Sequence, residues 1–321
     1  MTARDSVNQF IQKYLALLCL ASLFAGLASG ESAARMAAAI PWFLGLLTFN
    51  CGLGLRLQDL ASLRRKPWVL PLHLALLHVG MPLIAMSLSS LLGFDFDAVM
   101  GFVILAIIPI SASGVVWVGI YRGNLTLAMA LLLMDMLLAP FFIPYVLELL
   151  FGASVHLDPF RMLQSLFWML LFPTLLALLL NRATNGGLQR VAGSAFSFLA
   201  KMSMFVLLFI NGGVVAPFFH DFDLLFFELL LMVFFFCCLW FILSFCLGRL
   251  VFSEDQDVVA FMYSSSIRGT ATGIVIAMTF FPPMTTLVVV MNLLFQQSMG
   301  SVAGKIVLRH LARKAGKKSR P

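Results

Sequence analysis

Residues 264–273, Ser-Ser-Ser-Ile-Arg-Gly-Thr-Ala-Thr-Gly, interrupt what would otherwise be a continuous apolar membrane helix. Serines, threonines, two glycines and Arg268 stand where lipid would favour leucine. A guanidinium at bilayer depth costs about 2.5 to 3.5 kcal/mol even on the lenient insertion scale. The stretch therefore predicts a broken helix whose polar groups face protein or water rather than lipid.

A similar stretch occurs earlier in the chain. Residues 111–116, Ser-Ala-Ser-Gly-Val-Val, align with residues 270–275, Thr-Ala-Thr-Gly-Ile-Val, about 160 positions later. Residues 46–52 and 207–213 form a second pair at nearly the same offset. Chance recurrence of Leu, Gly and Ser is the alternative, and two matching offsets disfavour it. The chain is therefore predicted to consist of two repeats.

The composition is that of a membrane protein. Of 321 residues, 61% are hydrophobic and 11% are charged, against about a quarter charged in soluble domains. The apolar runs reach the roughly 20 residues that a helix needs to cross the bilayer. The net charge of +7 does not indicate a nucleic-acid partner, because the basic residues lie at helix ends and in a C-terminal tail. The predicted class is an all-α membrane protein whose partner is the lipid bilayer.

Apolar runs bounded by charges and turn residues predict about ten transmembrane helices. They begin near residues 13, 36, 67, 98, 124, 159, 192, 224, 257 and 284. Five helices per half make the second repeat, about 156–309, inverted relative to the first, about 1–155. Such inverted repeats are typical of secondary transporters. We expect one polytopic membrane domain over 1–321, ending in a basic cytoplasmic tail at about 310–321.

Lysine and arginine set the predicted orientation. Most of them fall on the side of the N-terminus and the tail, whereas Arg35 and Arg161 fall on the opposite side. The acidic residues of the opposite loops are Asp95, Asp97, Asp158, Asp221 and Asp223. The positive-inside rule therefore predicts a multi-pass protein of the cell inner membrane with both termini in the cytoplasm.

Polar residues within the predicted spans are candidates for a site. Paired broken helices expose backbone groups that are tolerated at membrane depth only toward protein or a water-filled cavity, so they mark a substrate or ion site near the midplane. The plainer alternative is a kink without a ligand. The hydroxyl-bearing candidates are Ser111, Ser113, Ser264, Ser265, Ser266, Thr270 and Thr272.

Arg268 has three interpretations. Its planar guanidinium suits a carboxylate or sulfonate of an anionic substrate. It can also serve as a fixed internal cation that holds the break together in place of a metal ion. The third interpretation is an ion pair with Asp135, the acid in the middle of span 5, whose protonation would also offer a proton-coupling site.

Four amides inside spans are candidates to line the cavity or to hold helices together. They are Asn50, Asn211, Gln296 and Gln297. His73 and His78 on span 3 are predicted to be packing residues, because no set of metal ligands accompanies them. Since Walker, zinc and nucleophile-elbow patterns are missing from the sequence, we expect no enzyme activity, no cofactor and no metal site.

Several short motifs together resemble the bile acid:sodium symporter family. They are Arg122-Gly123-Asn124, residues 138–144 (Leu-Ala-Pro-Phe-Phe-Ile-Pro), residues 52–55 followed by Asp59, Met81-Pro82, and residues 298–301 (Ser-Met-Gly-Ser). The resemblance covers nearly the whole chain. It implies ten helices in two inverted repeats, with helices 4 and 9 broken and crossing. It further implies an organic anion carried through a crevice between a core of spans 3–5 and 8–10 and a panel of spans 1, 2, 6 and 7.

The sodium ligands implied by that resemblance are replaced in this chain. Gly114 and Val115 follow the first break, and Ala128 and Leu132 stand where span 5 would carry hydroxyls. In the second break, Ser264 and Arg268 stand where the family has a glutamate and a glutamine. A carboxylate is lost and a permanent cation is gained, which would repel a hard cation.

The prediction is a secondary transporter or exchanger of a small organic anion that works by alternating access, without sodium and with protons as one available coupling ion. One alternative is a transporter-like sensor or scaffold whose basic tail binds a cytoplasmic protein or anionic lipid. Another is a carrier similar to the auxin-efflux family. The substrate, the direction of transport and the oligomeric state stay open at this point.

Overall fold

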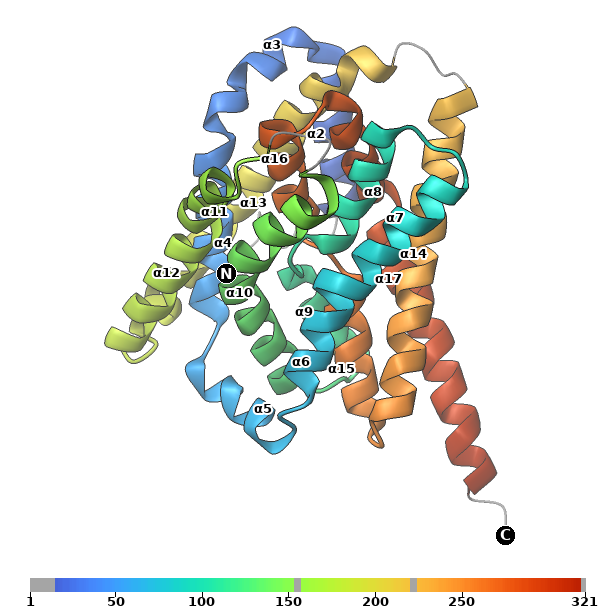
Figure 1. The fold of residues 1–321 in the computed structure, drawn as a ribbon. Helices are drawn as coiled ribbons and strands as arrows, with labels where there is room; N and C mark the ends of the chain where they lie inside the picture. The colour runs from blue at the N-terminus through green and yellow to red at the C-terminus, as the bar shows by residue number, and fades with distance from the viewer. Residues whose placement is uncertain (1–14, 153–156, 220–223, 319–321) are drawn as a thin grey trace. The chain divides into compact units, whose positions relative to one another are not determined.

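The computed structural model describes residues 15–152, 157–219 and 224–318, and Figure 1 shows their helices. Within these described ranges, seven helical segments are long and apolar enough to cross a membrane. They are Glu31–Gly54, Val69–Leu91, Leu125–Phe151, Pro159–Ala183, Gly187–Val215, Leu224–Val251 and Pro283–Val307. The prediction of an all-α membrane protein is thereby confirmed.

Shorter helices lie where the other three spans are expected. One is α2 (Leu15–Ser29), and the other two are interrupted segments, α8 (Phe96–Ile107) with α9 (Ala112–Ile120) and α15 (Asp255–Ser266) with α16 (Thr270–Phe280). The count of ten crossings, the inverted repeats and the orientation of the termini stay predictions. Of the charges used for the orientation, those outside the described residues are Arg4, Lys13, Asp221, Asp223 and Arg320.

The chain divides into two compact units, each built from two separate stretches of sequence. The first unit comprises Met1–Gly54 and Arg161–Asp223. Its main helices are α2, α3 (Glu31–Ala34), α4 (Ile40–Gly54), α11 (Pro159–Leu166), α12 (Phe172–Ala183) and α13 (Gly187–Val215). These residues are those of the expected spans 1, 2, 6 and 7.

Small residues allow close helix packing in the first unit. A Cβ added at Gly26 of α2 would lie 1.9 Å from the carbonyl oxygen of Phe209 on α13, and one added at Gly52 of α4 would lie 2.7 Å from that of Thr174 on α12. Without a hydrophobic driving force between helices in lipid, such close backbone contact supplies much of the attraction. Both glycines are therefore required by packing.

The second unit comprises Leu55–Phe160 and Leu224–Pro321, the residues of spans 3–5 and 8–10. Its first half holds α5 (Ala61–Arg65), α6 (Val69–Ala75), η3 (Leu76–Gly80), α7 (Met81–Leu91), α8, α9 and α10 (Leu125–Phe151). Its second half holds α14 (Leu224–Val251), α15, α16 and α17 (Pro283–Lys318). The helices that precede the two breaks form the centre, since residues 98–107 of α8 and 257–266 of α15 are all buried.

The helix of span 3 contains a π-helical turn, η3, between α6 and α7. Pro82 follows this turn and has no N–H to donate to the carbonyl four residues earlier, which belongs to His78. A π-turn accommodates the missing hydrogen bond by carrying one extra residue, and such turns are frequent at functional sites. His78 thus lies in an irregular turn rather than in a regular helix.

The Arg122-Gly123-Asn124 motif has a structural role at the start of α10. Arg122 adopts a positive φ of 55°, and a Cβ at Gly123 would lie 2.8 Å from a methyl group of Val259. Asn124 caps α10, and its Nδ2 donates to Asp257 Oδ1 at 2.8 Å. The motif therefore joins the start of α10 to the start of α15.

Candidate functional site

The two helix breaks contact each other through their backbones. The N–H of Ser111 donates to the carbonyl of Ile267 at 3.0 Å, and the N–H of Gly269 donates to the carbonyl of Pro109 at 2.7 Å. These bonds form an antiparallel bridge that pairs Ile110 with Arg268. Both breaks are thus confirmed, and each satisfies backbone groups that the other leaves open.

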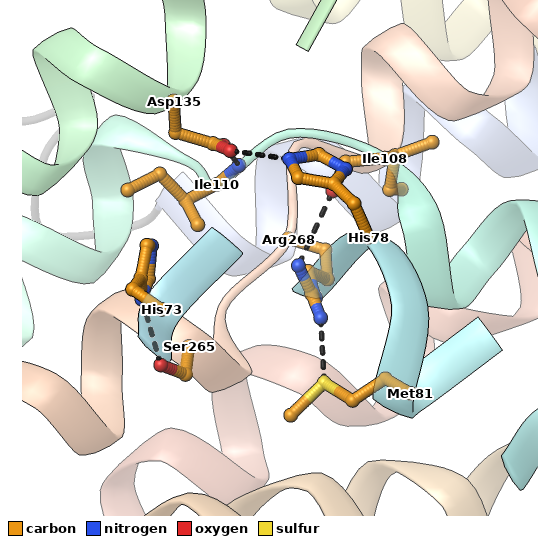
Figure 2. Close-up of polar contacts among 8 residues, drawn as sticks. All are labelled: His73, His78, Met81, Ile108, Ile110, Asp135, Ser265 and Arg268. Carbon is orange, nitrogen blue, oxygen red and sulfur yellow. Dashed lines mark hydrogen bonds and ion pairs between the residues drawn. The ribbon is translucent and has the colours of Figure 1, made fainter. Parts of the chain in front are cut away.

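Arg268 lies at the centre of this contact and is only 1% exposed. One terminal nitrogen of its guanidinium donates to the carbonyl oxygen of Ile108 at 3.3 Å, and the other contacts Met81 Sδ (Figure 2). Its Nε is buried and has no hydrogen-bond partner in the part of the chain that the structure describes. Arg268 therefore contacts the backbone of the first break, and its role stays a prediction.

Side chains of α17 satisfy the backbone of the second break. Gln296 Oε1 accepts from the N–H of Arg268 at 2.9 Å, and Gln296 Nε2 donates to the carbonyl of Arg268 at 3.0 Å. Asn292 Nδ2 donates to Gln296 Oε1 and to Thr270 Oγ1, both at 3.0 Å. Gln296 and Thr270 are thus brought together as predicted site residues, whereas Asn292 was not expected.

Asp135 satisfies the backbone of the first break. It is fully buried, and its Oδ2 accepts from the N–H of Ile110 at 2.7 Å. Its Oδ1 lies 2.8 Å from Nε2 of His78, which is also buried. Figure 2 shows the carboxylate between the His78 ring and the Ile110 nitrogen.

The predicted direct pair of Arg268 with Asp135 is wrong, because among the described residues the side chain that contacts the Asp135 carboxylate is His78. The peptide segment 108–110 lies between the two charges, since Arg268 donates to its first carbonyl and Asp135 accepts from its last N–H. The prediction that His78 only packs is also wrong. The proline four residues after His78 is the signal from which an irregular turn could have been predicted.

The three serines before the second break face different partners. Ser265 Oγ lies 3.1 Å from Nδ1 of His73, and Ser266 Oγ donates to the carbonyl of Trp240 at 3.1 Å. Ser264 Oγ is buried without a partner. Ser265 therefore joins α15 to α6 close to the charged groups, and His73 has a polar partner in addition to its packing contacts.

A chain of hydrogen bonds lies at the start of α9. Trp117 Nε1 donates to Gln297 Oε1 at 2.9 Å, Gln297 Nε2 donates to Ser113 Oγ at 3.3 Å, and Ser113 Oγ donates to Ser111 Oγ at 3.0 Å. Gln297 is exposed and Ser111 and Ser113 are partly exposed. These neutral donors and acceptors are accessible, unlike the buried charges beside the same break.

The other predicted site residues lie elsewhere. Asn50 and Asn211 belong to the first unit, where Asn211 is buried and its Oδ1 has no partner. Thr272 is nearly buried in the first turn of α16.

Three positions at which the resemblance implied sodium ligands, Gly114, Ala128 and Leu132, carry apolar residues in closely packed surroundings. A Cβ at Gly114 would lie 3.1 Å from the carbonyl oxygen of Tyr263, and Ala128 and Leu132 are buried within α10. Within residues 15–152, 157–219 and 224–318, no three His, Cys, Asp or Glu side chains gather in a way that could hold a metal ion. The positively charged group that binds a break carbonyl here is the guanidinium of Arg268.

Comparisons with known proteins agree with a transporter. A family model described as the SBF-like CPA transporter family matches residues 8–313. The uncharacterized protein YbaS of Bacillus subtilis (strain 168) is 29% identical over 273 residues, which cover 84% of this chain and 89% of that protein.

Two further relatives match over less than half of their length. The uncharacterized sodium-dependent transporter YocS of Bacillus subtilis (strain 168) is 27% identical over 139 residues, which are 43% of each chain. The probable sodium/metabolite cotransporter BASS1, chloroplastic, of Oryza sativa subsp. japonica is 28% identical over 156 residues, which are 49% of this chain and 38% of that protein.

Proposed function

Because the chain belongs to the SBF-like CPA transporter family, we propose that it is a secondary transporter of a small organic anion that does not require sodium. Two of the relatives carry sodium dependence in their names. This chain differs from the pattern of the bile acid:sodium symporters at the residues that would bind the ion. The chain is therefore proposed to be a secondary transporter like these relatives but without coupling to sodium.

The observation that carries the proposal is the guanidinium of Arg268 on the carbonyl of Ile108. The carbonyl oxygens of a broken helix are ligands that a hard cation would use. Here a permanent charge, buried to 99%, already donates to one of them. A sodium ion nearby would be repelled by that charge and would find no side-chain oxygen at Gly114, Ala128 or Leu132.

The start of α9 supports an anionic substrate. The backbone N–H groups of a helix N-terminus favour negative charge. Ser111, Ser113 and Gln297 add accessible hydrogen-bond donors there, and Arg268 adds a buried positive charge next to the same break. We assign the substrate contacts to this accessible set, with Arg268 acting on the anion from the protein interior.

Equivalent contacts in the two halves support the inverted repeat and alternating access. Asp135 of α10 accepts from the N–H of Ile110, and Gln296 of α17, about 160 residues later, accepts from the N–H of Arg268. Ile110 and Arg268 pair with each other. In each half, a side chain of the helix that follows the break accepts a hydrogen bond from the backbone N–H of that break. Such equivalent contacts are expected for two structural repeats that meet at the bridge.

A further pair of contacts has the same relation. Thr285 Oγ1 at the start of α17 donates to the carbonyl of Asp97 at the start of α8. Asn124 at the start of α10 donates to Asp257 at the start of α15. Asn124 lies about 160 residues before Thr285, and Asp257 lies about 160 residues after Asp97. We infer that the two halves, about 1–155 and 156–309, are related by this repeat.

The experiment is flux through the purified protein in liposomes with labelled taurocholate, benzoate, pyruvate and benzenesulfonate. Each anion is tested in sodium buffer and in potassium or choline buffer. We expect uptake of at least one anion at equal rates in all three buffers. Steep dependence on sodium would refute the coupling, and tight binding without flux would favour the sensor.

A matched variant separates the two roles of Arg268. If the guanidinium replaces a cation, Arg268→Gln introduces a requirement for sodium. If Arg268 only recognises the anion, the same variant weakens anion binding and leaves the ion requirement unchanged. Asn211→Ala, in the other unit, controls for a general loss of packing.

A further inference from the structure

We propose that His78, Asp135 and Arg268 form a charge-balanced group that takes up one proton together with each monovalent organic anion. The inference rests on the proposed transport of an anion. It adds the coupling ion, the stoichiometry and the residue His78 as the partner that holds the proton.

The three side chains converge on the segment 108–110 of the first break. Arg268 donates to the carbonyl of Ile108 at 3.3 Å, and the N–H of Ile110 donates to Asp135 at 2.7 Å. The other carboxylate oxygen lies 2.8 Å from His78 Nε2. All three side chains are at most 1% exposed, so solvent does not screen their charges (Figure 2).

The titratable and charged groups around the dyad of His78 and Asp135 are few. Among the described residues, α6 contributes His73, which binds Ser265, and the second break contributes Arg268. The segment α7 carries no titratable side chain. Asp97 and Glu148 occupy the outer ends of α8 and α10, a turn or more of helix away from the break, and Tyr263 and Asp257 lie on α15.

With neutral imidazoles, the charges of Asp135 and Arg268 cancel. One proton added to His78 leaves the three side chains with a net charge of +1. An uncompensated charge in a buried site is costly, so the proton enters more readily when a monovalent anion arrives at the same break. By thermodynamic reciprocity, the anion then also binds more tightly when the dyad is protonated.

His78 is suited to this role. Imidazole is the side chain that changes charge near neutral pH, and its free Nδ1 is buried without a partner. The ring stacks on Phe142 at 5.4 Å between centroids, which fixes its plane, while the π-turn η3 carries its backbone. Because proton and anion cancel, the transport step moves no net charge across the membrane.

The test measures binding of the four anions to the purified wild-type protein, at about pH 6 and about pH 8. We expect the Kd of the bound anion to fall by up to about tenfold for each pH unit of acidification. His78→Gln keeps a hydrogen bond to Asp135 but cannot titrate, so it should abolish the pH dependence. His73→Gln, a second buried histidine of the same span, should retain it.

Proteoliposomes with an entrapped pH dye provide the second measurement, on the wild-type protein alone. Anion uptake should acidify the lumen and should not respond to membrane potential. Binding that is equal at both pH values, uptake driven by an inside-positive potential, or unchanged pH dependence in His78→Gln would each overturn the inference and leave anion transport intact. If none of the anions binds or crosses, the proposed function itself fails.

Discussion

The coupling between Asp135 and Arg268 predicts a measurable non-additivity of stability. Asp135→Asn keeps acceptor and donor atoms for Ile110 and His78 but removes the negative charge. It therefore leaves Arg268 as an uncompensated charge in a buried site, a change that typically costs about 3 to 5 kcal/mol. Arg268→Gln leaves Asp135 uncompensated in the same way. The double variant removes both charges and should recover part of the loss.

The structure sets the size of that recovery. Contacts of 3.3 and 2.7 Å join the two charged groups to the ends of a three-residue segment. Standard backbone dimensions then place the charges no more than about 10 Å apart. Coulomb's law with an effective dielectric constant of about 20 gives roughly 2 to 4 kcal/mol for separations of about 4 to 10 Å.

The assay is unfolding of the four proteins of the cycle in mixed detergent micelles with increasing dodecyl sulfate. Each variant loses some free energy of unfolding. We expect the sum of the losses of the two single variants to exceed the loss of the double variant by the coupling energy. A control cycle pairs Asp135→Asn with Thr285→Val, at the outer start of α17, and should be additive. Additivity within about 0.5 kcal/mol for Asp135 and Arg268 would refute the charge balance at the break.

Three further predictions concern single variants. Gln296→Leu should lower the free energy of unfolding by about 2 to 4 kcal/mol, because the N–H and carbonyl of Arg268 lose their partners, whereas Gln297→Leu on the exposed side should change it by less than about 0.5 kcal/mol. Gly123→Ala should lower the free energy of unfolding by about 1 to 3 kcal/mol, since the new Cβ would lie 2.8 Å from two valine methyl groups. The control Gly119→Ala, whose new Cβ would lie 3.6 Å from its nearest atom, should leave the free energy of unfolding unchanged. A Gly123→Ala variant as stable as the wild type would contradict the packing argument. Arg268→Lys keeps the positive charge but loses the planar guanidinium, so we expect anion flux to fall at least about tenfold without any gain of sodium dependence. Sodium-stimulated flux in this variant would argue against the positive charge as the factor that excludes sodium.

The breaks and their contact were predictable from the sequence. Hydroxyls, glycines and an arginine within apolar runs conflict with lipid, and two such runs at one offset indicate that they share a site. The family resemblance supplied the crossing of the two broken helices. Arg268 could be singled out because a charge at that depth needs a partner, and Gln296 because it forms a pair of adjacent amides with Gln297 in an apolar run.

The partners themselves were not predictable. A single sequence shows that His78 lies in span 3 and Asp135 in span 5 but not which faces meet, because a π-turn shifts the helical register by one residue. Asn292 gave no signal either, since one amide in an apolar run is equally typical of helix packing. The expected pair of opposite charges was therefore replaced by two charges that each hold one end of the same peptide segment.

The π-turn at Leu76–Gly80 has a consequence for how the chain tolerates changes in length. A π-turn carries one residue more than an α-turn, so deletion of a single residue there would place the segment in α-helical register, with the hydrogen bond at Pro82 left unmade. Because each residue of an α-helix turns the chain by about 100°, the segment on one side would rotate by that angle about its axis. One missing codon would thus yield a membrane-inserted protein in which His78 points away from Asp135.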